Sequence, residues 1–220
     1  MENQIEVVTL TFNPFAEQTY LVYQPNGEGV IIDPGCYTPE EKVMLREAVS
    51  KANFTPVAVW NTHCHIDHVL GNAFTCKTWG IPLGVPKGEQ GDLQGVLNYG
   101  PTFGIFPEPS PIPEQLFLSG QTLTFSGVKV EVIGAAGHSR DGVCFYFSEF
   151  GLLFGGDVLF YDSIGRTDLP GGNLNTLLNN IHLKLMVLPA EVKVYPGHGE
   201  PTTIGREKKF NPFLQTPISK

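Results

Sequence analysis

Four side chains in one short run have the types and the spacing of metal ligands. Residues 62–68 read Thr-His-Cys-His-Ile-Asp-His, which places His63, His65, Asp67 and His68 within six positions. Side chains alternate along an extended chain, so the first three are expected on one face and His68 elsewhere unless the chain turns. Imidazole and carboxylate together suit zinc, iron or manganese. The run predicts a metal site, and its two sets of ligands favour a pair of ions.

The elements around this run are predicted to hold it in place. Residues 56–60 have the composition of a strand that leads the chain to His63. Apolar residues at helical spacing after His68 predict a helix that ends at Gly80. Alternation turns Cys64 away from the neighbouring histidines, so it is interpreted as a packing residue.

Three later positions complete a pattern of seven ligands. His138 stands in Ala-Gly-His-Ser, Asp157 in Gly-Gly-Asp-Val and His198 in Pro-Gly-His-Gly. Together with the run at 63–68, they resemble the HxHxDH signature and the later ligands of the metallo-β-lactamase superfamily. The resemblance implies an α/β fold, the αββα four-layer sandwich of that superfamily.

The same resemblance implies how the ligands are shared. One metal ion would take His63, His65 and His138, and the other Asp67, His68 and His198, with Asp157 bridging both. Two zinc ions are expected, with iron or manganese as alternatives. A hydroxide shared by the two ions would be the nucleophile, and Asp67 would orient it as the catalytic residue.

Two further segments resemble one subgroup of the superfamily. Residues 165–172, Gly-Arg-Thr-Asp-Leu-Pro-Gly-Gly, and the Asn-Pro-Phe run at 211–213 are similar to hydroxyacylglutathione hydrolases (glyoxalase II) of a short bacterial form. That likeness implies a small-molecule thioester as substrate, with a glutathione derivative as one candidate. Arg166 and Tyr161 are the candidate substrate-binding residues. The alternative for Arg166 is an ion pair with Asp168 or Asp162 that holds the loop.

Other functions share this ligand set. Persulfide dioxygenases resemble the chain in the same residues, with one iron bound by His63, His138 and Asp157. A lactonase or β-lactamase is less favoured, because secreted β-lactamases often carry Arg at the position of His68 and Cys at that of Asp157. A non-catalytic scaffold on the same fold would have no use for seven buried polar ligands.

Composition limits the remaining choices. The 220 residues are 41% hydrophobic and 16% charged, which predicts a single domain over residues 1–220. A formal net charge of −8 argues against a nucleic-acid surface. No apolar stretch approaches the roughly 20 residues that span a bilayer. Scattered cysteines and the absence of a basic, signal-like start predict a cytoplasmic protein.

Periodicity predicts the other elements. A helix is expected after Thr38, whose hydroxyl and Glu41 form a capping box, and a second helix after the N-cap Asn173. Residues 86–115, rich in Pro and Gly, are predicted to be irregular; Tyr99, Phe103 and Phe106 there either line a substrate mouth or anchor a surface loop. Asp33 is either a turn carboxylate or a support for the metal ligands. Strands are predicted at 5–12, 19–24, 29–33, 122–125, 128–134, 143–147, 152–154 and 192–195.

Overall fold

A computed structural model describes residues 4–215, which form two compact units. The first unit runs to Phe117 and includes Thr124–Val128; the second holds Leu118–Leu123 and the chain from Lys129 onward. Each unit is built on one six-stranded sheet. No helix in the described part of the chain is long and apolar enough to cross a membrane. That residues 1–220 form a single domain stays a prediction.

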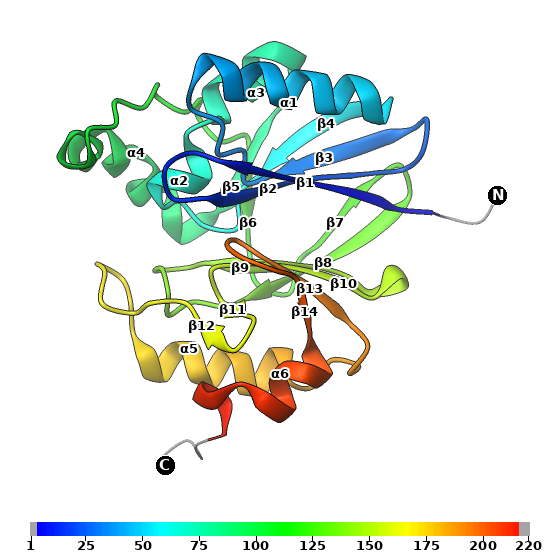
Figure 1. The fold of residues 1–220 in the computed structure, drawn as a ribbon, viewed down its shortest axis with the longest axis vertical. Coiled ribbons are helices and arrows are strands. Elements are labelled where there is room, and N and C mark those ends of the chain that lie inside the picture. Colours follow the sequence, from blue (N-terminus) through cyan, green and yellow to red (C-terminus); the bar gives the residue numbers. More distant parts are fainter. Residues whose placement is uncertain (1–3, 216–220) are drawn as a thin grey trace. The chain divides into compact units, whose positions relative to one another are not determined.

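The first sheet has the order β1-β2-β3-β4-β5-β6, and helices α1 and α3 cover one of its faces (Figure 1). β1, β2 and β3 are antiparallel neighbours, whereas β3, β4, β5 and β6 pair in parallel. The elements are β1 (Glu6–Phe12), β2 (Glu17–Tyr23), β3 (Glu28–Ile32), α1 (Pro39–Ala52), β4 (Thr55–Trp60), α2 (Ile66–Val69), α3 (Asn72–Trp79), β5 (Leu83–Pro86), η1 (Lys87–Glu89), α4 (Gln90–Tyr99), η2 (Gly100–Phe103) and β6 (Gln115–Phe117).

Helix α1 begins where the sequence predicts, directly after Thr38. The Glu41 amide donates to the Thr38 hydroxyl (3.2 Å), and the Thr38 amide donates to the Glu41 carboxylate (3.0 Å). Such a cap contributes about 1 kcal/mol. Glu41 also accepts from the amide of Asn13 (2.6 Å), so the capping carboxylate ties the β1–β2 turn to the helix.

The prediction that residues 86–115 are irregular is wrong in part, because α4 occupies Gln90–Tyr99. Gly91 and Gly95 lower the helix propensity of this segment and obscure its period. Burial of Leu93 and Val96 in a cluster with Ile66 and Ile105 stabilises the helix instead. The helix predicted to follow His68 is also divided, into α2 and α3.

The second sheet has the order β14-β13-β10-β9-β8-β7, with α5 and α6 on one face. The Asn173 side chain accepts from the Thr176 amide (2.9 Å), as expected of an N-cap, and α5 continues into a π-helical turn. The elements are β7 (Thr122–Phe125), β8 (Val128–Gly134), β9 (Val143–Phe147), η3 (Ser148–Phe150), β10 (Leu152–Gly156), β11 (Leu159–Phe160), β12 (Ser163–Ile164), α5 (Leu174–Asn180), η4 (Ile181–Leu185), β13 (Lys193–Pro196), β14 (Thr202–Thr203), α6 (Ile204–Phe210) and η5 (Pro212–Leu214).

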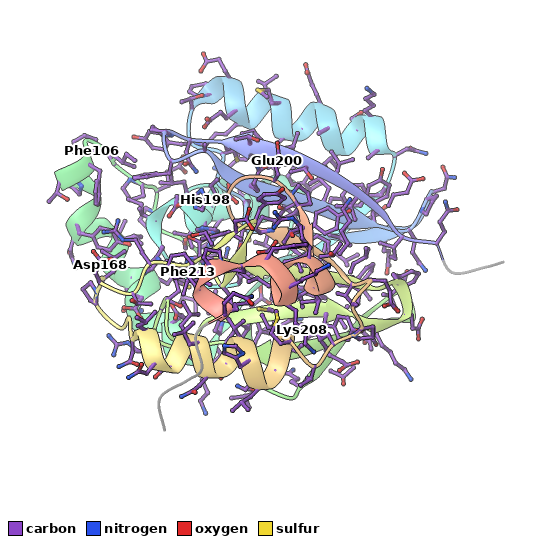
Figure 2. All side chains as sticks on the ribbon, turned by 60° about the horizontal axis from the view of Figure 1, so that its bottom comes forward. Phe106, Asp168, His198, Glu200, Lys208 and Phe213 are labelled. Carbon is purple, nitrogen blue, oxygen red and sulfur yellow. The ribbon has the colours of Figure 1, made fainter. Side chains whose placement is uncertain are left out.

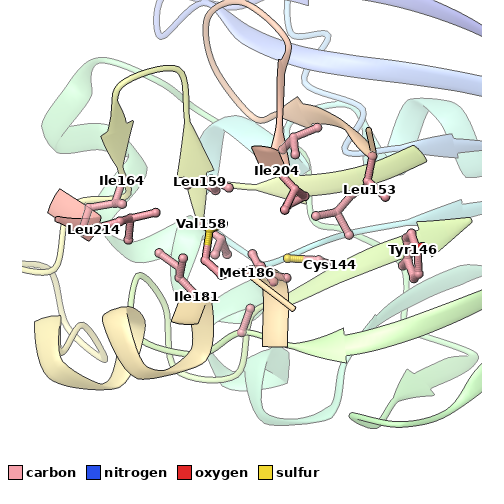
Figure 3. Close-up of a cluster of buried hydrophobic side chains, with 14 of the residues drawn as sticks. Cys144, Tyr146, Leu153, Val158, Leu159, Ile164, Ile181, Met186, Ile204 and Leu214 are labelled. Atoms are coloured by element: carbon pink, nitrogen blue, oxygen red, sulfur yellow. The ribbon is translucent and has the colours of Figure 1, made fainter. Parts of the chain in front are cut away.

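The core of the second unit lies between its sheet and its helices (Figure 3). Leu153 and Val194 from the parallel strands β10 and β13 contribute to this core, as do Leu177 of α5 and Ile204 of α6. The short β11–β12 hairpin adds Leu159 and Ile164. Because Leu159 and Ile164, the first and last residues of the hairpin, are buried in this core, the packing of the core fixes the base of the hairpin.

Candidate metal centre

Parallel pairing in the first unit delivers two groups of polar residues to one sheet edge. β3 and β4 pair in parallel, with a register shift between Gly29 and Val30, and the last pair is Ile32 opposite Trp60. The carboxyl ends of neighbouring parallel strands meet at the same edge, so Asp33 comes beside the run at 61–68. His63 and His68 are buried there, and their ring centroids lie 4.2 Å apart. The His65 ring lies 4.7 Å from that of His63. One turn thus gathers three imidazoles.

Asp33 supports this turn through hydrogen bonds. Its carboxylate accepts from the Thr62 amide (2.7 Å) and the Thr62 hydroxyl (2.6 Å). Its Oδ2 also lies 3.1 Å from Nδ1 of His68, and because a carboxylate only accepts, the imidazole must donate there. Nε2 of His68 is then the nitrogen that can face a metal. Of the two roles predicted for Asp33, the contacts show the supporting one.

The backbone of Asp67 is fixed from the β1–β2 turn. The Asn13 side-chain amide donates to the Asp67 carbonyl (3.0 Å) and to the Gly35 carbonyl (3.0 Å). A Cβ on Gly35 would lie 2.8 Å from that Asp67 carbonyl oxygen and 2.7 Å from the Asn13 amide nitrogen, so glycine is required for this close approach. The Asp67 carboxylate then stands with Oδ2 3.6 Å from Nε2 of His68.

Glu17 is a buried neighbour of the site that sequence reasoning missed. Its Oε1 lies 4.0 Å from Nδ1 of His68, and its Oε2 accepts from the Thr19 hydroxyl (3.0 Å). Burial raises the pKa of the Glu17 carboxyl well above its usual value, although the nearby His68 opposes the shift. A single glutamate at the start of a strand carries no spacing signal, because nothing in its local pattern distinguishes a buried position from an exposed one.

In the second unit, parallel strands place Asp157 beside His198. β10 and β13 are parallel neighbours, and Asp157 and His198 follow their carboxyl ends. Oδ2 of Asp157 lies 3.5 Å from Nε2 of His198 and 3.5 Å from Nε2 of His138. Figure 2 shows His198 on the loop that follows β13.

The backbone after β12 orients His138. Its Nδ1 lies 2.8 Å from the carbonyl oxygen of Arg166, so Nδ1 donates and Nε2 points to Asp157. A side chain at Gly165 would overlap the Asp157 carbonyl and approach His138 Nδ1 to 3.0 Å. On the other side, the Asn173 amide donates to the Gly137 carbonyl (2.7 Å), which fixes the His138 loop to the start of α5.

These separations fit a bound metal. Two ligand atoms on a tetrahedral zinc ion, each bonded at roughly 2.0–2.1 Å, lie about 3.3–3.4 Å apart. The Asp157–His138, Asp157–His198 and Asp67–His68 pairs are 3.5, 3.5 and 3.6 Å apart, which is close to that value and too long for a strong hydrogen bond. The ligand atoms are histidine nitrogens and aspartate oxygens, and the second ring nitrogen of His68 and of His138 is hydrogen-bonded to a carboxylate and to a carbonyl. Such a set of ligands suits zinc, iron or manganese.

The two residues predicted to bind substrate have other partners in the structure. Nε and Nη2 of Arg166 each donate to one carboxylate oxygen of Asp168 at 2.7 Å, and the pair is well exposed. The guanidinium lowers the pKa of Asp168 to about 2. Of the two roles left open for Arg166, the structure shows the loop-holding pair. Tyr161 lies under the Arg206 guanidinium, 3.4 Å from its ring centroid to the guanidinium carbon.

Two further predictions concern Cys64 and the aromatic loop. Cys64 is fully buried among Val59, Ile66 and other apolar residues, and burial raises the pKa of its thiol, so its role as a packing residue is confirmed. Phe103 and Phe106 are exposed, and the Phe103 ring packs edge-on against Phe15 at 5.7 Å. Figure 2 shows Phe106 at the outer edge of the segment that contains α4.

The family model of the metallo-beta-lactamase superfamily matches residues 13–198. The chain belongs to this superfamily. Its members are generally metal-dependent hydrolases, and a relative in Bacillus subtilis, 34% identical over 196 residues with 88% of this chain and 86% of the relative covered, is named a probable metallo-hydrolase, YqgX. The His/Asp clusters of both units accord with that chemistry.

Other members of the superfamily align with nearly all of this chain. An uncharacterized protein of Mycobacterium tuberculosis, Rv2581c, is 36% identical over 207 residues, which cover 89% of this chain and 91% of the relative. The hydroxyacylglutathione hydrolase GloC of Haemophilus influenzae is 31% identical over 215 residues, which cover 96% and 98%.

Solved structures agree with the superfamily assignment. The B3 metallo-beta-lactamase BLEG-1 is 32% identical with a TM-score of 0.89, over 96% of this chain and all of that one. TTHA1623, solved in a di-iron-bound form, is 33% identical with a TM-score of 0.85, over 94% of this chain and all of that one. These matches confirm the predicted metallo-β-lactamase fold, an α/β fold with two sheets.

Proposed function

We propose that the chain is a metal-dependent thioester hydrolase of the hydroxyacylglutathione hydrolase type. The observation that carries the proposal is the position of Asp157, whose Oδ2 lies 3.5 Å from Nε2 of both His138 and His198. One carboxylate oxygen equally distant from two imidazoles is suited to a bridging ligand in a two-metal site. The likeness to GloC over nearly the full length of both chains supports the choice of a thioester.

The proposal divides the seven ligands between two ions. One ion would be held by His63, His65 and His138, the other by Asp67, His68 and His198, and Asp157 would be shared by both. Zinc is the proposed metal, since the donors are imidazoles and carboxylates. Iron and manganese use the same donors, and the di-iron form of TTHA1623 makes iron the first alternative to assay.

A bound metal pair would supply a hydroxide near neutral pH and would polarise the thioester carbonyl. The residues of the chain perform the remaining tasks. Asp67 would accept a hydrogen bond from the nucleophile, while the contact of Asp33 with Nδ1 of His68 would leave Nε2 as the nitrogen that can bind a metal. A leaving thiolate is a weak base, so no general acid is required. Arg166 and Tyr161 bind the substrate away from the reacting carbon, and Arg166 exchanges its Asp168 partner for an anionic group.

A persulfide dioxygenase is the alternative. His63, His138 and Asp157 form a two-histidine, one-carboxylate set of the kind that binds iron in oxygenases. ETHE1 of Myxococcus xanthus has the same fold, with a TM-score of 0.79 over 97% of this chain and 86% of that one, but at 22% identity the likeness concerns the fold alone. The ligands are common to both reactions, so the metal count and the reaction must decide.

The test is metal analysis of protein purified without added metal, with hydrolysis of a glutathione thioester assayed on the same sample. The proposal predicts two ions per chain and release of free thiol. A content of one ion that stays unchanged when zinc is added would contradict the two-metal site.

A further inference from the structure

Glu207 is a fully buried carboxylate in α6 that joins three parts of the second unit. Both of its oxygens accept hydrogen bonds, so four donors depend on one side chain. The donors are the Asp162 amide (2.9 Å), the Asn211 side-chain amide (2.9 Å), the Thr202 hydroxyl (2.5 Å) and Nη1 of Arg206 (2.7 Å). Glu207 therefore connects α6 to β14, to the segment after α6 and to the tip of the β11–β12 hairpin.

Arg206 holds the same hairpin tip at two more points. Nη1 and Nη2 donate to the two carboxylate oxygens of Asp162 at 2.8 and 2.9 Å. The guanidinium also stacks on Tyr161 at 3.4 Å. Asp162 has a φ of 55°, a left-handed conformation that persists only where neighbouring contacts fix it. The tip of the hairpin is thus held through the amide and the carboxylate of Asp162 and through the ring of Tyr161.

This hairpin leads directly from the metal centre. One residue, Val158, separates Asp157 from β11, and the Phe160 ring lies 6.4 Å from the His198 ring at an angle of 74°. Leu159 and Ile164 anchor the base of the hairpin in the core (Figure 3). Tyr161, at 47% exposure, follows Phe160 at the tip of the hairpin and packs against Arg206 of α6. Movement of the tip would therefore displace Tyr161 while the base stays in place.

We propose that Glu207 is a positioning residue that orders the hairpin so that Tyr161 contacts the thiol-carrier part of the substrate. That the ligand is a thiol carrier rests on the proposed thioester hydrolysis. The ordering of the hairpin by Glu207 does not depend on that proposal. Ordering the tip before the substrate arrives removes an entropic cost from binding. A carboxylate is needed because an amide at this position would turn an N–H₂ group toward two of the four donors.

The test compares Glu207→Gln with the wild-type chain by hydrogen exchange of residues 159–164 and by steady-state kinetics. Exchange of the Asp162 amide is expected to become faster in the variant, since its acceptor is weakened or lost. KM for a glutathione thioester is expected to rise about tenfold, which corresponds to the cost of ordering roughly one residue, with kcat changed by less than about twofold.

Thr202→Val is the matched control. It removes the Thr202 hydrogen bond to Glu207 on the β14 side and leaves the contacts of the hairpin in place. It is expected to lower the melting temperature without changing KM or the exchange of residues 159–164. Arg206→Lys is a second test variant, because one ammonium cannot make the two-point contact to Asp162; it is expected to change KM and exchange in the direction of Glu207→Gln.

The two proposals fail in different ways. A Glu207 that only stabilises the fold would lower the active fraction, which reduces the apparent kcat and leaves KM unchanged; that result, or equal exchange of the hairpin in wild type and variant, would overturn the positioning role. A wild-type protein that binds metal but hydrolyses no thioester would contradict the proposed function instead.

Discussion

Oδ2 of Asp157 lies 3.5 Å from Nε2 of His198, a separation expected of two ligands on one metal ion. The same oxygen is equally distant from His138. Both contacts lie within the second unit and follow from the parallel pairing of β10 with β13 and from the fixed loop around Gly137. Asp157 is therefore the residue on which the two-metal proposal depends most.

Asp157→Ala is expected to lower the metal content at both proposed positions, because one carboxylate serves both ions. Metal analysis after gel filtration measures the content, and circular dichroism checks that the variant is folded. The bridging role is wrong if the variant keeps two ions per chain and near-normal turnover.

Asp33→Ala is expected to weaken metal binding through His68 without removing a ligand. The variant loses the carboxylate that accepts from Nδ1 of His68 and from Thr62. Loss of such a supporting contact typically costs about 10- to 100-fold in metal affinity or activity. Competition with a chelator measures the affinity, and Glu47→Ala, at an exposed position of α1, serves as the control. Equal affinities in the two variants would count against the supporting role.

Arg166→Ala is expected to raise KM for an anionic thioester more than it lowers kcat, because the anion is held equally before and during attack. Loss of one charge-assisted contact corresponds to roughly 1.5–3 kcal/mol, or about 10- to 150-fold in kcat/KM. Metal content should not change, since the residue orients His138 through its backbone carbonyl.

Asp168→Asn tests the role of Arg166 by changing its ion-pair partner. It weakens the two-point pair that occupies Arg166, so KM for the anionic substrate should fall while KM for a neutral thioester stays constant. Hydrolysis that is indifferent to both variants would remove Arg166 as the anchor and leave the reaction itself unaffected.

Much of the fold could be predicted from local patterns. The capping box at Thr38 and Glu41 locates the start of α1, and alternating β-branched residues locate the main strands. Helix α4 escaped prediction because two glycines weaken its local signal, while burial of Leu93 and Val96 against distant residues stabilises it. The β11–β12 hairpin and α6 are short, and contacts through Glu207 hold them together.

In the candidate site too, local motifs predict some features, whereas others depend on contacts between residues distant in the sequence. Motifs predict the seven ligand positions. The structure gathers four of them in the first unit (His63, His65, Asp67 and His68) and three in the second (His138, Asp157 and His198). Their assembly into one centre stays a prediction. The contact of Glu17 with His68 could not be predicted, and the sequence could not choose between Asp168 and Asp162 as the partner of Arg166, because both contacts depend on which side chains the fold brings within hydrogen-bond distance.

The most direct test of the proposed reaction is thiol release by zinc-loaded protein under anaerobic conditions. A hydrolase needs water and no oxygen, so free thiol should appear from S-lactoylglutathione or a similar thioester at the same rate with and without oxygen. A dioxygenase would consume oxygen with a persulfide and require iron. Thiol release from zinc-loaded protein without oxygen is the predicted result; no thiol from any thioester, with iron-dependent oxygen consumption on a persulfide, would contradict the account.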